Sequence, residues 1–310
     1  MAKKQTLVNV LAPILAALLG VSVLARPTRT VAADQSRVPR VLLIHGRDQQ
    51  AGAKMKVADD WNAAINSALR KAGAYSFLPR ERRLFYWYRD ALAGSGCTYG
   101  SPFQESFDRT PGFDLMPTLR EVFTSIADQV PAGPARILAK LIVNDAERYV
   151  ANGPSTCIVD RGFRDAVDRD PNRTMPVIVI AHSLGSMITY RNLMRNIPDE
   201  FAPFYLITIG SMLGEPAVQR TLLGSHADYP APVPIPVKWW RNLVNKGDVL
   251  AFPSASAFYS EFPDKKPVDI MIDTPGSDRH SATAYLSSLE MGQALRAASC
   301  AALPTQKGCP

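Results

Sequence analysis

A serine stands where a predicted strand must turn sharply into a helix, and at such a turn a hydroxyl can act as a nucleophile. The strand is Val-Ile-Val-Ile (177–180), and the serine lies in Ala-His-Ser-Leu-Gly (181–185). The turn exposes the side chain and aims the next backbone N–H at a developing oxyanion. Ala181 replaces the first glycine of the usual Gly-x-Ser-x-Gly pattern and is small enough for the same packing. The pattern predicts that Ser183 is a nucleophile; the alternative is a serine that only caps the helix.

A serine nucleophile needs a base, and the chain has four histidines to supply it: His45, His182, His226 and His280. His182 lies inside the turn, His45 ends the first predicted strand, and His226 precedes a proline-rich run. His280 lies in a polar loop directly after the last predicted strand, from which it can reach over the sheet edge. We therefore predict His280 as the base. The alternative is an exposed loop histidine without a catalytic role.

The base needs a carboxylate to orient it, and Asp248 stands at the end of a predicted strand. Its position between Ser183 and His280 gives the chain order Ser, Asp, His, which is typical of one class of serine hydrolases. The alternative for Asp248 is a plain turn at 246–248. Four other aspartates compete for the role: Asp228, Asp269, Asp273 and Asp278.

An oxyanion hole requires two backbone N–H groups, one after the nucleophile and one from the loop after the first core strand. The first is the N–H of Leu184. The loop begins with Ile-His-Gly (44–46), and Gly46 lets the backbone approach a substrate closely. We predict that the second N–H belongs to Arg47.

The elements that must position these groups alternate between strands and helices. Strands are predicted at 38–46, 84–88, 177–180, 204–209, 237–244 and 268–272. Helices are predicted at 54–72, 184–196, 216–223 and 281–297. This alternation predicts an α/β protein with a mostly parallel sheet and helices on both faces. The stretch 89–174 is too long for a simple crossover and is read as a helical insertion, with helical patterns at 114–129, 134–151 and 156–169.

Together these motifs resemble the α/β-hydrolase family, in particular its serine lipases and esterases. Besides the blocks at 44–46 and 181–185, the resemblance rests on Asn-Lys-Gly-Asp-Val-Leu-Ala (245–251), the His280 loop and Thr-Ile-Gly-Ser-Met-Leu-Gly (208–214). It implies one domain over 38–310, with fewer strands before the first core strand than the family usually has.

The resemblance also implies a Ser-Asp-His triad, an acyl-enzyme, and neither a metal nor an organic cofactor. The function predicted is hydrolysis of small-molecule or lipid esters. The alternatives are an acyltransferase, thioesterase or amidase on the same triad, or a non-catalytic envelope protein that retains the fold.

The N-terminus has the pattern of an export signal. Lys3 and Lys4 precede an apolar stretch at 7–24, and small-residue cleavage sites follow Ala25 and Ala33. We therefore interpret 1–33 as a signal peptide, and the alternative is an uncleaved membrane anchor. Export predicts a periplasmic, secreted or envelope-associated protein.

An even number of cysteines agrees with export, because oxidising compartments favour disulfides. The four are Cys97, Cys157, Cys300 and Cys309. Proximity in sequence favours a Cys300–Cys309 bond that closes a C-terminal loop, and Cys97–Cys157 would then tie the insertion together. There is no Cys-x-x-Cys pair, so the sequence does not support a zinc ribbon.

The net charge excludes few classes of function, but it does not favour a nucleic-acid-binding role. It is +7 for the whole chain and +5 after loss of Lys3 and Lys4 with the signal. The basic residues are scattered, which is compatible with a weak attraction to an anionic membrane or envelope surface. The segment from Gly46 to Lys54 lacks the spacing of a phosphate-binding loop.

Overall fold

The protein is described by a computed structural model of its 310 residues. The residues that it describes are 38–46, 53–75, 77–92, 97, 121, 124, 144–146, 148–149, 154–169, 175–195, 202–223, 230–276 and 278–309. The predicted signal peptide or anchor at 1–33 lies outside them, as do Arg47 and His226. Residues 39–310 belong to one unit.

The described part of the chain forms a six-stranded sheet in which every neighbouring pair is parallel. In spatial order the strands are β2 (Arg83–Tyr86), β1 (Arg40–Ile44), β3 (Val177–His182), β4 (Phe204–Ile209), β6 (Val237–Asn245) and β8 (Val268–Ile272). Each corresponds to a predicted strand. The central strands β3 and β4 are buried along their whole length, because helices cover both faces of the sheet.

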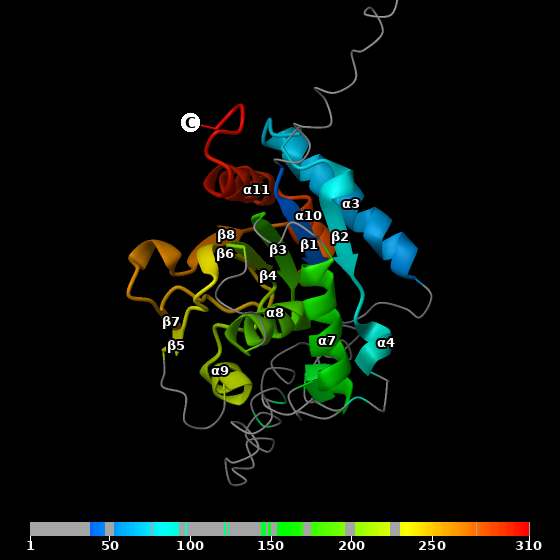
Figure 1. Cartoon of the computed structure of the whole chain (residues 1–310), viewed down its shortest axis with the longest axis vertical. Coiled ribbons are helices and arrows are strands. Elements are labelled where there is room, and N and C mark those ends of the chain that lie inside the picture. Colours follow the sequence, from blue (N-terminus) through cyan, green and yellow to red (C-terminus); the bar gives the residue numbers. More distant parts are fainter. Residues whose placement is uncertain are drawn as a thin grey trace, which may run out of the picture. The chain divides into compact units, whose positions relative to one another are not determined.

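Two helical layers enclose this sheet (Figure 1). One contains α3 (Lys54–Lys71), α10 (Ala282–Leu286) and α11 (Leu289–Ala302); the other contains α7 (Pro154–Asp168), α8 (Leu184–Arg195) and α9 (Pro216–Leu223). Alternate residues of β3 enter opposite layers: Val177 and Val179 pack with α7 and α8, while Ile178 and Ile180 pack with α3 and α11. The sheet therefore has a hydrophobic core on each face.

The reversal of strand order explains why α3 and α8 lie on opposite faces. The chain moves from β1 through α3 to β2 in one direction, and from β3 through α8 to β4 in the other. Parallel crossovers are right-handed, so a change of direction moves the crossover helix to the other face. The α/β architecture predicted from the sequence is confirmed at this level.

The remaining described elements are short. They are α4 (Arg89–Leu92), a two-stranded sheet of β5 (Ala231–Pro232) and β7 (Phe258–Tyr259), and the 3-10 helices η1 (Arg80–Arg82) and η2 (Pro263–Lys265). Of the three helices predicted within 89–174, the last is confirmed as α7, which packs against α8 and β2. The patterns at 114–129 and 134–151 lie almost entirely outside the described residues.

The single helix predicted at 281–297 is wrong, because two helices, α10 and α11, occupy this stretch. The break falls at Ser287 and Ser288. The Ser288 side chain accepts a hydrogen bond from the Met291 N–H at 3.0 Å and so caps the start of α11. The apolar period continues across the break, and for this reason the pattern alone suggested one helix.

Both predicted disulfides are present. Cys97 bonds to Cys157 in α7 across 60 residues, and Cys300 in α11 bonds to Cys309 across 9 residues. Such bonds are compatible with an exported protein in an oxidising environment. Within the described residues, no helix has both the length and the hydropathy needed to cross a bilayer.

Candidate active site

The carboxyl ends of β1 and β3 meet where the strand order reverses. From β1 the chain moves outward to β2 and then returns to the other side of β1 as β3. Open parallel sheets bind ligands at such a switch point, outside the carboxyl ends of the strands. His45 and Gly46 follow β1, and Ser183 follows β3. The topology therefore brings the predicted nucleophile to the place where a ligand is expected.

Ser183 has a backbone conformation that residues other than glycine seldom adopt, with a φ of 51°. Its N–H donates to the carbonyl of Ile209 at 3.0 Å, and its carbonyl accepts from the Ser186 N–H at 2.9 Å. A helix-capping serine has an extended backbone instead. The turn stores strain of about 1–3 kcal/mol, a feature that clusters at functional sites.

Two glycines permit this turn to pack closely. A Cβ at Gly185 would lie 2.5 Å from the carbonyl oxygen of His45 and 2.7 Å from that of Ile44. A Cβ at Gly46 would lie 2.8 Å from the Cβ of Ser183. Both contacts are too short for any side chain, so α8 and the end of β1 need glycine there.

Three predicted side chains converge at this edge of the sheet. Ser183 Oγ lies 3.0 Å from His280 Nε2, and His280 Nδ1 lies 2.9 Å from Asp248 Oδ2 and 3.0 Å from Asp248 Oδ1. A carboxylate can only accept, so Nδ1 carries the proton and Nε2 is free to accept from the hydroxyl. In this order the imidazole can take the serine proton while the carboxylate stabilises the resulting charge.

Asp248 is held in place by two further donors. Its Oδ1 accepts from the Leu250 N–H at 3.0 Å, and its Oδ2 accepts from the Tyr285 hydroxyl at 2.7 Å. The residue stands in a turn after β6, in which Gly247 has a φ of 80° and the Asp248 N–H donates to the Asn245 carbonyl at 3.0 Å. Its side chain is only 1% exposed, so these bonds replace the water that the carboxylate has lost.

The loop that carries His280 is tied to the end of β6. Asn245 Nδ2 donates to Thr274 Oγ1 at 2.7 Å and to the Arg279 carbonyl at 2.8 Å. Arg279 Nη1 in turn donates to Asp273 Oδ1 at 2.8 Å on the surface. These contacts fix both ends of the loop.

Leu184 begins α8, so its N–H has no partner within the helix and lies at the positive end of the helix dipole. This agrees with its predicted place in an oxyanion hole. The second predicted donor, Arg47, lies outside the described residues. Gly46, which precedes it, contacts the Ser183 turn directly.

The competing histidines have other contacts. His45 Nε2 accepts from the Tyr88 N–H at 3.2 Å, its Nδ1 donates to the Gly46 carbonyl, and its ring stacks on that of Tyr88 at 4.1 Å. Burial lowers the pKa of His45 to about 4, so the ring is neutral and structural. His182 Nε2 lies 2.9 Å from the carbonyl oxygen of His280 and not beside Ser183 Oγ.

The competing aspartates that the structure describes are also engaged elsewhere or exposed. Asp269 accepts from the N–H groups of Ser254 and Ala255 at 2.8 and 2.9 Å, and so shapes the loop after Asp248. Asp273 pairs with Arg279, and Asp278 is exposed. Asp228 lies outside the described residues.

Sequence reasoning did not identify Tyr285 or the role of Asn245. The Tyr285 hydroxyl accepts from the Asn245 N–H at 3.0 Å while it donates to Asp248. Burial, and then the negative charge of Asp248, raises the pKa of Tyr285 far above its ordinary value, so the phenol stays a donor. Asn245 begins the Asn-Lys-Gly-Asp-Val-Leu-Ala motif (245–251). No local pattern in the sequence marks Tyr285, which lies 37 residues from Asp248.

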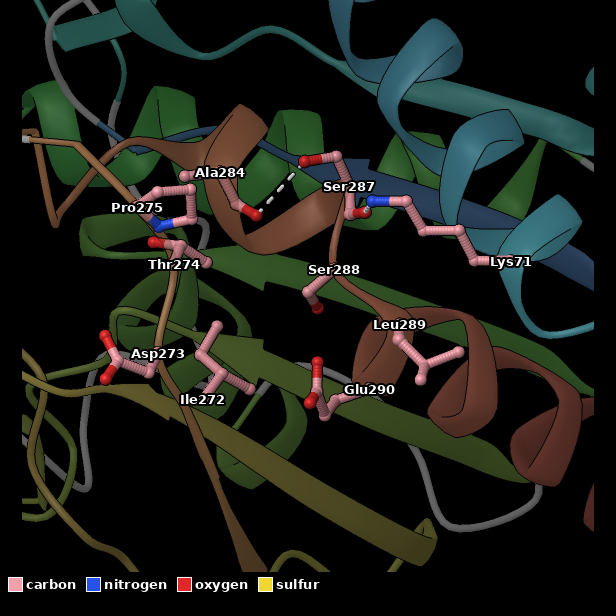
Figure 2. A pocket seen from close by; sticks show the side chains of 10 residues that line it. All are labelled: Lys71, Ile272, Asp273, Thr274, Pro275, Ala284, Ser287, Ser288, Leu289 and Glu290. Carbon is pink, nitrogen blue, oxygen red and sulfur yellow. Dashed lines mark hydrogen bonds between the residues drawn. The ribbon is translucent and has the colours of Figure 1, made fainter.

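Access to the three convergent side chains is restricted. Ser183 has no exposed surface, and the His280 side chain is 10% exposed. A cavity of about 330 Å³ lies beside the His280 loop, between the last turn of α3 and the segment that joins α10 to α11 (Figure 2). Its lining includes Lys71, Thr274 and Ser288 but none of Ser183, Asp248 and His280, so this cavity is separate from the candidate active site.

Among the described residues, no group of three or more His, Cys, Asp or Glu side chains could hold a metal ion. No family model matches the chain, and no curated protein matches it. Function is therefore inferred from the sequence motifs and from the geometry of the site.

Proposed function

We propose that this chain is a serine hydrolase that cleaves carboxylic esters on an α/β-hydrolase fold. The observation that carries the proposal is the 3.0 Å contact between Ser183 Oγ and His280 Nε2, made by a serine whose φ is 51°. The position of Ser183 at the switch point of the sheet and the chain order Ser183, Asp248, His280 support the same fold and chemistry.

Acylation begins when Ser183 Oγ attacks the ester carbonyl carbon and His280 Nε2 takes the hydroxyl proton. The N–H groups of Leu184 and Arg47 donate to the resulting oxyanion, while Asp248 stabilises the imidazolium. His280 then gives its proton to the alcohol oxygen, the carbon–oxygen bond of the ester breaks, and the acyl group stays on Ser183.

Deacylation repeats these steps with water. His280 Nε2 takes a proton from the water as its oxygen attacks the acyl carbon, and the oxyanion again accepts from the two N–H groups. When this intermediate collapses, Ser183 Oγ leaves with the proton from His280, and the carboxylic acid is released.

We further propose that the enzyme acts outside the cytoplasm, in the periplasm, in the envelope or as a secreted protein. The export pattern at 1–33 and the two disulfides support this location. The substrates would then be small-molecule or lipid esters.

A fluorophosphonate probe and a panel of p-nitrophenyl esters of increasing acyl length test the proposal together. The probe should label Ser183, and Ser183→Ala should abolish both labelling and hydrolysis. Ser260→Ala serves as a control, because this hydroxyl contacts the Phe262 N–H in an exposed loop away from the site. Labelling that survives in Ser183→Ala, or a wild type inert to the probe and to every ester, would contradict the proposal.

A further inference from the structure

His182 is a buried histidine in the Ser183 turn to which the proposed mechanism gives no role. It is the last residue of β3, directly before the nucleophile, and it is 4% exposed. Its ring centroid lies 4.8 Å from that of His280. The rings of Trp61 and Tyr285 lie farther away, with centroids at 6.3 and 6.4 Å from that of His182.

One hydrogen bond fixes the tautomer of this ring. Nε2 lies 2.9 Å from the His280 carbonyl oxygen, which can only accept, so Nε2 carries the proton. Nδ1 is fully buried and has no hydrogen-bond partner among the described residues, as expected for the bare nitrogen of a neutral ring. Burial, and then the charge of His280, lowers the pKa of His182 well below its ordinary value, so the ring stays neutral.

The hydrogen bond from His182 is one of two that together fix the backbone on either side of His280. The Arg279 carbonyl accepts from Asn245 Nδ2 at 2.8 Å, and the His280 carbonyl accepts from His182 Nε2. These carbonyls belong to the two planar peptide units on either side of the His280 Cα. Holding both units therefore sets the direction of the Cα–Cβ bond and with it the place of the imidazole. The two donors are the last residues of β6 and β3.

We propose that His182 is a positioning residue that sets the spacing between base and nucleophile. Because His182 and Ser183 are consecutive, the Nε2–H bond ties the loop of His280 to the very turn that carries the hydroxyl. A loop released from this bond can carry the imidazole away from Ser183 Oγ, and a displacement of about 1 Å can reduce turnover about 100-fold. The inference rests on the proposed hydrolysis.

A matched pair of substitutions separates the hydrogen bond from the bulk of the ring. His182→Gln retains an N–H donor of similar reach, and His182→Met has a similar length without a donor. We expect His182→Met to lower kcat on an active p-nitrophenyl ester by roughly 10- to 100-fold with KM changed less than about threefold, and His182→Gln to recover most of the loss. Equal kcat in the two variants, or a loss confined to KM, would overturn the proposal. An inactive wild type would instead be a failure of the proposed hydrolysis.

Nuclear magnetic resonance of the wild type, labelled with ¹⁵N-histidine, tests the bond without activity. The chain has four histidines, so substitution of the other three in turn leaves the His182 signal assigned. The titratable groups that face this ring are His280, His45 and Tyr285. We expect the Nε2–H tautomer, unchanged between about pH 5 and pH 8. An Nδ1–H tautomer, or a ring that gains a proton in this range, would refute the role even if both variants failed to fold.

Discussion

The Tyr285 hydroxyl is a buried side-chain donor to the Asp248 carboxylate, and Tyr285→Phe removes only this hydroxyl. The ring and its packing remain, because phenylalanine has the same shape. The hydroxyl donates to Asp248 Oδ2 at 2.7 Å, the same oxygen that lies 2.9 Å from His280 Nδ1. It also accepts from the Asn245 N–H at 3.0 Å. The substitution therefore breaks two hydrogen bonds in a place that water does not reach.

The expected loss of stability follows from these two contacts. A hydrogen bond to a charged group contributes about 1.5–3 kcal/mol, and an unsatisfied buried N–H costs about 1–3 kcal/mol. Because relaxation recovers part of both, we expect the free energy of unfolding of Tyr285→Phe to fall by about 2–4 kcal/mol. A less firmly held carboxylate also orients His280 less well, so kcat should fall roughly 10-fold.

The pH–rate profile should move in a direction that a purely structural loss would not produce. A carboxylate with one donor fewer attracts the imidazole proton more strongly, so the acidic limb of kcat/KM should move to higher pH. If half of a contribution of about 1.5 kcal/mol passes to the imidazolium, the limb moves by about half a pH unit. Its direction is the decisive feature, because general damage lowers the whole profile without shifting it.

The assay is kcat/KM for a soluble p-nitrophenyl ester across the acidic range, with denaturant unfolding of the same preparations. Tyr205→Phe is the control, since it too removes a tyrosine hydroxyl, here one that donates a single hydrogen bond to the Ala301 carbonyl at 3.0 Å, away from the site. A Tyr285→Phe variant that retains the wild-type acidic limb and is no less stable than Tyr205→Phe would refute this account of the carboxylate.

Three further perturbations test other parts of the molecule. His45 has a pKa of about 4, below the ordinary 6.5. The neutral buried ring therefore contributes about 3 kcal/mol to the free energy of unfolding, which is present above pH 6.5 and lost as pH falls towards 4. Free energies of unfolding measured across this range should show the decline. Gly185→Ala forces a Cβ to within 2.5 Å of the His45 carbonyl oxygen and should lower kcat/KM at least about 10-fold in the ester assay. Replacing Cys300 and Cys309 by serine opens a loop of 9 residues and should lower unfolding free energy by about 2–3 kcal/mol with kcat unchanged.

The sheet could be predicted because its signal is local. A strand covered on both faces must be apolar along its length, and runs such as 177–180 and 204–209 have no helical period. The sharp turn at Ser183 could be predicted for the same reason, since strand, Ser183 and helix are contiguous. Asp248 and His280 required the additional rule that parallel strands end at one edge of the sheet.

The remaining parts of the site depend on contacts that no local pattern records. The Tyr285 hydroxyl reaches Asp248 only because α10 packs beside the turn after β6, and nothing in the sequence near Tyr285 indicates this. The pattern did not predict the break between α10 and α11, because Ser287 and Ser288 interrupt the helical conformation without interrupting the apolar period. Proximity in sequence supported one disulfide, but the Cys97–Cys157 pair followed only by elimination.

The precision of the candidate site comes from the ends of strands, even though His280 itself lies on a loop. Asn245 ends β6 and holds the Arg279 carbonyl, while His182 ends β3 and holds the next carbonyl along the chain. His182 pairs with Ile209 of β4 and Asn245 pairs with Ile272 of β8, so the side chains of these strand ends vary little in position. A loop that takes its backbone hydrogen bonds from such residues acquires the rigidity of the sheet. For this reason the loop could change in length or composition between its anchors and still present His280 to Ser183, provided that both carbonyls keep their donors.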